Sequence, residues 1–176
     1  MGFRVQLIAV SGMSPAKVQQ DFGVEPTGEY EEVAESPVVG AELPDGRYLL
    51  YVNDADRIIP DNGVYARLSR GAKLVACYAN ETVMNSYACG WVDGTERWSV
   101  FHDAQQSITH LEVSGTPPAE LGPIRDRLLG QQAEVTDPDY VFDVPVELFV
   151  ALGGMRYDED LPDAEPEPWE ILEPVA

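Results

Sequence analysis

Hydrophobic and polar residues alternate along several short stretches of the chain, which is the period-two pattern of a β-strand with one face on a core. The first stretch covers residues 3–8. Two more, residues 38–43 and 47–52, flank Pro44-Asp45-Gly46. Because Asp-Gly tolerates the positive φ angles of a tight turn, these two stretches predict a β-hairpin.

A denser group of strands is predicted between residues 73 and 113, as an antiparallel meander over residues 73–79, 83–92, 96–102 and 108–113. Its middle turn, Asp93-Gly94, is a second Asp-Gly signal with a two-residue loop. A hairpin loop of known length fixes which residues face each other, so the register follows by counting. The expected pairs are Trp91 with Glu96, Cys89 with Trp98, Val100 with His110, and His102 with Ile108.

Helical spacing of apolar residues appears in four other places. For the first helix, Ser14-Pro15 supplies a cap and a first-turn proline, and Gly23 marks the end. Residues 24–35 are rich in glutamate and are predicted to form a solvated loop. The expected helices cover residues 15–22, residues 61–70, residues 116 to about 132, and roughly two turns after Asp143.

Together these elements predict an α+β fold, with an antiparallel sheet of about six or seven strands and three or four short helices mainly on one face. Residues 1–157 are expected to form a single globular domain. In residues 158–176, eight of nineteen side chains are acidic and four are proline, which favours an extended, solvated tail. Trp169, Ile171 and Leu172 lie inside that tail, so a tail strapped onto the body or onto another molecule is an equal alternative.

The charge narrows the classes of partner. The chain of 176 residues carries 31 acidic and 11 basic side chains, a formal net charge of −20. Nucleic acid and anionic membranes would be repelled by such a surface, so neither is expected as a partner, whereas a basic protein would be attracted. No apolar run is long enough to cross a bilayer, and Arg4 and Gln6 interrupt the only N-terminal run. A cytoplasmic location is expected, with Cys77 and Cys89 as reduced thiols. The oligomeric state is left open.

The predicted register places an unusual group of side chains on one face of the meander. The opposite face is more apolar and is predicted to be the core, so the first face is the candidate for ligand or partner binding, with Cys77 expected to join it. The candidate residues are Tyr87, Cys89, Trp91, Trp98, His102, His110 and Glu112.

The residue types on this face allow several chemistries, but their spacing argues against each. Zinc takes Cys and His ligands, but the two cysteines are twelve residues apart and the two histidines eight, unlike the short spacings of known zinc motifs. A cysteine nucleophile would need positive charge near its thiol, which a strongly acidic chain supplies poorly. Phosphate-loop, dinucleotide, nucleophile-elbow and HExxH motifs are absent from the sequence. We therefore expect no catalytic residue, no bound metal and no cofactor.

In small size, strong acidity, α+β pattern and lack of catalytic motifs, the chain is similar in general character to bacterial immunity and antitoxin-like proteins. That resemblance implies a non-enzymatic binding protein for a basic partner, and a DNA-mimic inhibitor is a special case of it. Two alternatives stay open. One is a small-ligand-binding or enzymatic domain with its pocket on the Trp/His/Cys face, and the other is a homo-oligomeric scaffold subunit.

Overall fold

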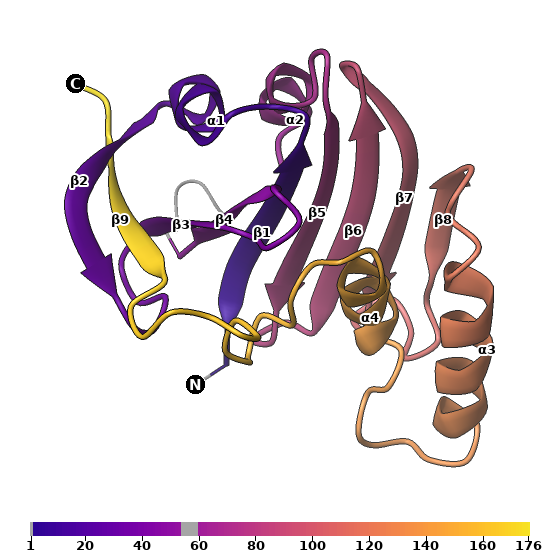
Figure 1. Ribbon diagram of the computed structural model, residues 1–176. Coiled ribbons are helices and arrows are strands. Elements are labelled where there is room, and N and C mark those ends of the chain that lie inside the picture. The colour runs from indigo at the N-terminus through magenta and orange to yellow at the C-terminus, as the bar shows by residue number, and fades with distance from the viewer. Residues whose placement is uncertain (1, 54–59) are drawn as a thin grey trace.

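Nine strands form one antiparallel sheet in the computed structural model, which describes residues 2–53 and 60–176 (Figure 1). From edge to edge their order is β2-β9-β3-β4-β1-β5-β6-β7-β8. Their bounds are β1 (Arg4–Ser11), β2 (Val24–Glu31), β3 (Val38–Glu42), β4 (Tyr48–Val52), β5 (Lys73–Asn80), β6 (Asn85–Val92), β7 (Thr95–Asp103), β8 (Glu112–Gly115) and β9 (Trp169–Pro174). The α+β prediction is confirmed, and the sheet has more strands than the six or seven expected.

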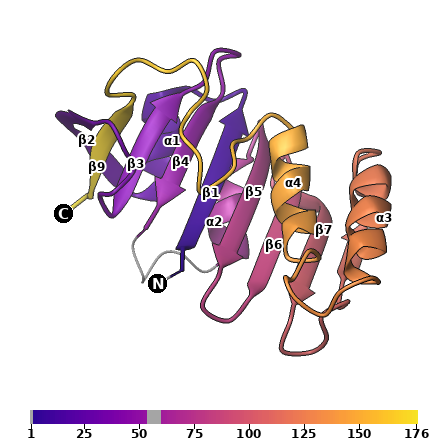
Figure 2. The same cartoon turned by 90° about the horizontal axis from the view of Figure 1, so that it is seen from below.

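Four helices in the described part of the chain lie on both faces of this sheet (Figure 2). Helices α1 (Pro15–Phe22) and α2 (Asn62–Leu68) cover one face, here called the α1/α2 face. Helices α3 (Leu121–Gln132) and α4 (Asp143–Ala151) cover the other, the α3/α4 face. The expectation that the helices lie mainly on one face is wrong, because the strands at the centre of the sheet are apolar on both sides.

Strand β1 shows this double burial most clearly. Every residue from Val5 to Val10 is buried. Ile8 and Val10 pack into the core below α1 and α2, whereas Leu7 and Ala9 pack into the core below α4. The polar position Gln6 is buried as well, and its side-chain amide donates a hydrogen bond to the Tyr65 hydroxyl of α2. A strand with helices on both faces needs apolar residues at both parities, so the period-two pattern in β1 was only partial.

Both Asp-Gly hairpins are confirmed. Asp45-Gly46 lies in the loop between β3 and β4, and Asp93-Gly94 forms the two-residue turn between β6 and β7. In the second turn both residues have positive φ, 48° at Asp93 and 77° at Gly94, which matches the right-handed twist of the flanking strands. The expected pair of Trp91 with Glu96 is present.

Beyond that pair, the predicted register of the meander is wrong. The register of β7 shifts between Gly90 and Trp91 of β6, so that Arg97 is the additional residue of a β-bulge. Trp98 therefore pairs with Gly90, where a Cβ would overlap its indole ring, and Cys89 pairs with Ser99. The turn after β7 is also longer than expected, so β8 begins at Glu112 and Val100 pairs with Val113 instead of His110. Because the bulge adds one residue to β7, every later side chain of this strand lies on the face opposite to the predicted one.

The acidic C-terminal segment contributes β9, which lies between β2 and β3 in the interior of the sheet. Trp169 is buried on the α3/α4 face and Leu172 on the α1/α2 face, as the alternation of a strand requires. Strand β2 is the other partner of β9, so the prediction of a loop over residues 24–35 is wrong for its first eight residues. The pairing joins segments about 140 residues apart in sequence, which a local pattern does not reveal.

Within the described residues, no helix is both long enough and apolar enough to cross a membrane.

Candidate functional site

The residues predicted to share one face of the meander are divided between the two faces. Tyr87, Cys89 and Trp91 lie on the α1/α2 face, and Glu112 shares that face because it pairs with Phe101, the partner of Tyr87. Trp98 and His102 lie on the α3/α4 face, as a result of the bulge in β7. Cys77 also lies on the α3/α4 face. The prediction that these residues share one face is therefore wrong. Their role in binding stays a prediction.

On the α1/α2 face, the predicted residues are parts of a packed layer. The Trp91 ring lies beside the Tyr65 ring of α2, with centroids 6.1 Å apart. On the same face, Tyr87 and its cross-strand neighbours Tyr78 and Phe101 form a row of half-buried aromatic rings. Glu96 accepts a hydrogen bond of 3.3 Å from the Tyr87 hydroxyl.

The two cysteines are unsuited to nucleophilic chemistry. Both are buried and free. Burial raises the pKa of the Cys89 thiol to about 12 and raises the pKa of Cys77 as well. Because the thiolate is the nucleophile, neither side chain is reactive near neutral pH.

His102 is fully buried and hydrogen-bonded at both ring nitrogens. Its Nδ1 lies 2.6 Å from the carbonyl oxygen of His110, and its Nε2 lies 2.8 Å from Oδ2 of Asp139. A carbonyl oxygen and a carboxylate oxygen are both good acceptors for a ring N–H, so each ring nitrogen has a polar partner inside the core. His102 thereby ties β7 to the loop before α4.

His110 has a different role. Its Nδ1 accepts a hydrogen bond of 2.9 Å from the backbone N–H of Asp103, and its ring contacts the Phe101 ring edge-on. It closes the turn between β7 and β8. Among the residues that the structure describes, no three His, Cys, Asp or Glu side chains converge closely enough to hold a metal ion.

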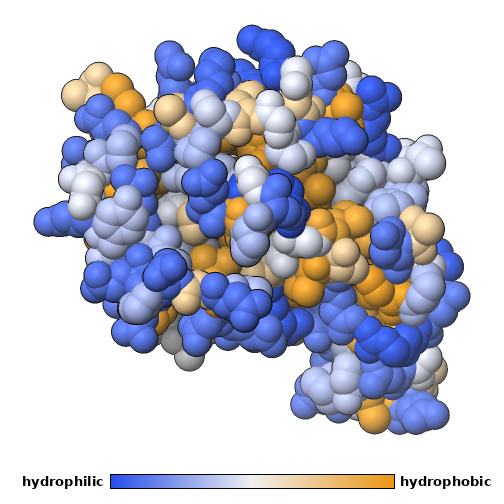
Figure 3. Space-filling view, in the orientation of Figure 1, coloured by the Kyte–Doolittle hydropathy of each residue, from blue (hydrophilic) through white to orange (hydrophobic). Residues whose placement is uncertain are grey.

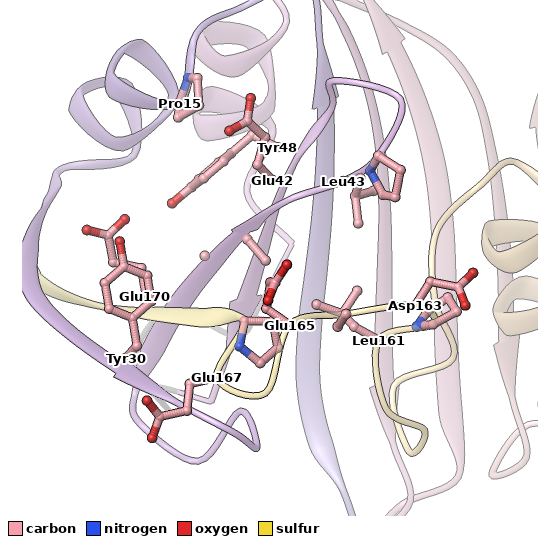
Figure 4. Close-up of a pocket in the computed structure, with 16 residues that line it drawn as sticks. Pro15, Tyr30, Glu42, Leu43, Tyr48, Leu161, Asp163, Glu165, Glu167 and Glu170 are labelled. Atoms are coloured by element: carbon pink, nitrogen blue, oxygen red, sulfur yellow. The ribbon is translucent and has the colours of Figure 1, made fainter.

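A different region of the molecule carries the open site. A groove of about 530 Å³ lies at the curled end of the sheet, between α1, the strands β2, β9 and β3, and the segment that leads into β9 (Figure 4). Tyr30, Tyr48 and Glu170 lie close together at one end of it, and Leu43, Leu161 and Asp163 at the other (Figure 4). We call it the acidic groove after its five carboxylates, which belong to Glu42, Asp163, Glu165, Glu167 and Glu170.

Strand alternation explains how the groove side chains are positioned. Trp169 and Leu172 are fixed in opposite cores, so Glu170 between them points to the α1/α2 face. Tyr30 pairs with Glu170 across β2 and β9, and Gly40 pairs with Glu170 on the other side. The Tyr48 ring lies over Gly40, where a Cβ would overlap it, and its hydroxyl accepts a hydrogen bond of 2.9 Å from Gln19 of α1.

The groove is strongly negative. None of its lining residues is Lys, Arg or His, and none of its five carboxylates forms an ion pair or a side-chain hydrogen bond with a described residue. Burial raises the pKa of the Tyr48 hydroxyl to about 12; the hydrogen bond from Gln19 opposes this shift, and the negative charges of Glu170 and Glu42 add to it. Mostly hydrophilic side chains cover β2 and β9, at the left of the space-filling view, whereas hydrophobic ones gather beside α4 (Figure 3).

One arginine lines the adjoining pocket, a space of about 260 Å³ that shares Leu43, Pro44, Leu161, Pro162 and Asp163 with the groove. Its guanidinium is already paired with the Asp45 carboxylate, 2.7 Å away. Arg47 donates to Asp45 at 2.8 Å and to the carbonyl oxygens of Leu152 and Gly153. This arginine therefore leaves the groove carboxylates uncompensated.

The sequence did not single out these groove residues. Four of the five carboxylates come from the segment that composition predicted to be a tail, and they form a groove only because β9 pairs with β2 and β3. The available signal was the presence of Trp169, Ile171 and Leu172 among acidic residues and prolines. Apolar residues at both odd and even positions can be buried on the two faces of a sheet, and they anchor such a segment as a strand.

No family model, curated protein or solved structure matches this chain. The groove's own chemistry is therefore the basis for a functional conclusion.

Proposed function

We propose that this protein is a non-enzymatic binding protein whose acidic groove receives an extended, positively charged segment of a basic partner protein. The observation that carries the proposal is a set of five carboxylates without an ion-pair partner among the described residues, around a groove whose described lining contains no basic residue. Lysine and arginine side chains from a partner would supply the missing countercharge.

The lining suits a peptide better than a bare cation. Leu43, Pro44, Leu161 and Pro162 give the groove an apolar side on which the methylene stems of lysine or arginine can lie. Tyr30 is 52% exposed and offers a ring face to a cationic head group. A net charge of −20 speeds encounter with a basic partner and disfavours acidic ones, nucleic acids included. Neutralisation of a basic toxin or of a nucleic-acid-binding protein is the biological role that fits this chemistry.

A lysine-rich peptide with an alternating Lys-Ala sequence tests the proposal. Its binding is measured by fluorescence anisotropy at low ionic strength and again at about 0.15 M salt, where the Debye length is about 8 Å. We expect saturable binding that weakens with salt. The double variant Glu42→Gln/Glu170→Gln should lower the affinity about two- to thirtyfold, because each exposed charge pair contributes about 0.2–1 kcal/mol.

The matched control is the double variant Glu120→Gln/Glu134→Gln, which removes the same charge from exposed residues on either side of α3. We expect it to change the affinity less than twofold. Equal losses in the two double variants would show that only net charge attracts the peptide, and the assignment of the groove would then be wrong.

A further inference from the structure

A second cavity lies on the α3/α4 face of the sheet; it shares no lining residue with the groove, and four of its lining residues are aromatic. It measures about 110 Å³, well below the roughly 300 Å³ at which pockets for drug-sized ligands begin. We call it the aromatic box after the four rings that line it, those of Phe3, Tyr51, Tyr157 and Trp169. A cavity of this size suits one small head group or the end of one side chain.

The four rings form two steep corners. Phe3 and Tyr157 have centroids 5.4 Å apart, and Tyr51 and Trp169 have centroids 5.7 Å apart, with an angle of 69° between the ring planes in both pairs. Tyr51 and Trp169 are each only 3% exposed and lie deep, while Phe3 is 43% exposed at the rim. Edge-to-face contacts of this kind fix the orientation of each ring within its pair. The Tyr157 ring also has the Arg156 guanidinium over it, with the guanidinium carbon 5.6 Å from the ring centroid.

Hydrogen bonds hold the rings in place before any ligand arrives. The Tyr51 hydroxyl donates to the backbone oxygen of Tyr157 at 2.8 Å. The Tyr157 hydroxyl donates to one oxygen of Glu81 at 2.6 Å, and the other oxygen accepts from the backbone N–H of Phe3 at 2.9 Å. Because both tyrosine hydroxyls are engaged, binding needs little side-chain ordering.

Negative charge surrounds this apolar space. Asp158, Glu159 and Asp160 also line the cavity. Asp158 is paired with Arg156 at 2.8 Å, whereas Glu159 and Asp160 form no ion pair with a described residue. The remaining lining is apolar, from Val33, Ala34 and Met155.

We propose that the aromatic box binds an alkylated ammonium group, such as the head group of choline or the side chain of trimethyllysine. Aromatic faces attract cations, and carboxylates at the mouth add a longer-range attraction. An unmodified ammonium has three N–H donors that need acceptors. Val33, Ala34 and Met155 offer none, so the acceptors nearest to hand are the exposed carboxylates of Asp158, Glu159 and Asp160 rather than groups inside the box. A methylated ammonium has no such need. The proposal concerns a different site from the acidic groove and holds or fails independently of it.

Choline binding by the full-length protein is the first test, measured by calorimetry and by the upfield ring-current shift of the trimethyl protons in NMR spectra. The uncharged isostere 3,3-dimethylbutan-1-ol is the chemical control. We expect saturable binding of choline and at least fivefold weaker binding of the isostere. Equal affinities would show an apolar pocket without selectivity for cations and would overturn the proposal, as would the absence of saturable choline binding.

Variants locate the site. Phe3→Leu keeps an apolar side chain at the rim and removes the ring, so choline affinity should fall about two- to fivefold with the fold retained. Tyr30→Ala, which removes an exposed ring in the acidic groove, should leave choline affinity unchanged. If Tyr30→Ala weakened choline binding and Phe3→Leu did not, choline would bind in the groove and the assignment to the aromatic box would be wrong. Near-UV circular dichroism checks that each variant is folded.

Two peptides that differ only in one residue, lysine or trimethyllysine, then distinguish the sources of the head group. A trimethyllysine peptide that binds more tightly than choline identifies a modified protein segment as the ligand. Choline binding as tightly as the peptide identifies a small molecule. Equal binding of the lysine and trimethyllysine peptides would contradict a preference for alkylated ammonium.

Discussion

Carboxylate side chains at the two ends of the sheet have opposite surroundings. At the end formed by β6, β7 and β8, His102 and Asp139 are desolvated, and each is hydrogen-bonded to the other. At the curled end, formed by β2, β9 and β3, the groove carboxylates are solvated and have no described partner. The first arrangement stabilises the protein itself, whereas the second leaves charge available to another molecule.

This difference has a thermodynamic reason. A buried charge is tolerated only with a partner, since loss of the partner leaves the full desolvation cost unopposed. Exposed charges are screened by water and salt, and they add little to stability even when they are paired. Substitutions at the β6–β8 end should therefore change mainly the free energy of unfolding, and substitutions in the groove should change mainly the affinity for a partner.

The largest effect is expected from His102→Ala. It removes a fully buried ring and leaves the nearly buried Asp139 carboxylate without this hydrogen-bond partner, so the free energy of unfolding in urea should fall by about 3–5 kcal/mol. Asp139→Asn is the sharper companion variant. A neutral His102 can keep its Nδ1–H bond to His110 and accept at Nε2 from the new amide, so this variant should cost only about 1 kcal/mol.

Similar losses in the two variants would show that the Asp139 carboxylate, and not the buried His102 ring, accounts for the stabilisation. A loss below about 1 kcal/mol for His102→Ala would show that the β6–β8 end does not depend on His102 at all.

The next effect concerns alkaline pH. Burial raises the pKa of Cys89 to about 12, against an ordinary value of about 8.5 in an unfolded chain. Above pH 8.5 the unfolded chain loses this proton while the folded protein keeps it, so the unfolded state binds fewer protons and stability falls as pH rises. The loss should reach about 1.4 kcal/mol per pH unit for this thiol and continue to about pH 12.

Urea unfolding at a series of pH values above 8 measures this slope, with Cys89→Ala as the comparison. The variant should show a shallower slope, and the native protein should resist thiol-modifying reagents at neutral pH. Rapid modification of Cys89 without unfolding, or an unchanged slope in the variant, would show that the thiol is not desolvated as described.

Local signals in the sequence were sufficient for much of the fold. The caps and breakers around α1 predicted its bounds, because Ser14 caps the helix through the Lys17 N–H and Gly23 takes a left-handed conformation. Both Asp-Gly turns were also predicted, since the positive φ values are a property of the turn residues themselves. These elements depend on contacts within a few residues.

Non-local pairing accounts for what the sequence did not reveal. The bulge at Arg97 depends on space for the Trp98 ring over Gly90, which lies on another strand. The groove depends on the pairing of β9 with β2 and β3, which places Glu170 opposite Tyr30. A period-two pattern fixes the parity of a strand only until the first bulge, so the predicted face was correct for Tyr87, Cys89 and Trp91 and failed for Trp98 and His102.

The smallest effect on stability is expected in the groove itself. Glu42→Gln/Glu170→Gln should change the free energy of unfolding by less than about 0.5 kcal/mol, since neither side chain has a described ionic partner to lose. At low ionic strength the sign should be stabilising, because two like charges are removed from a chain at −20, and the gain should vanish with added salt. The same variant is expected to bind the lysine-rich peptide less tightly, so stability and affinity would move in opposite directions. A destabilisation above 1 kcal/mol would mean that these carboxylates hold the curled end together, and the contrast between the two ends would then be lost.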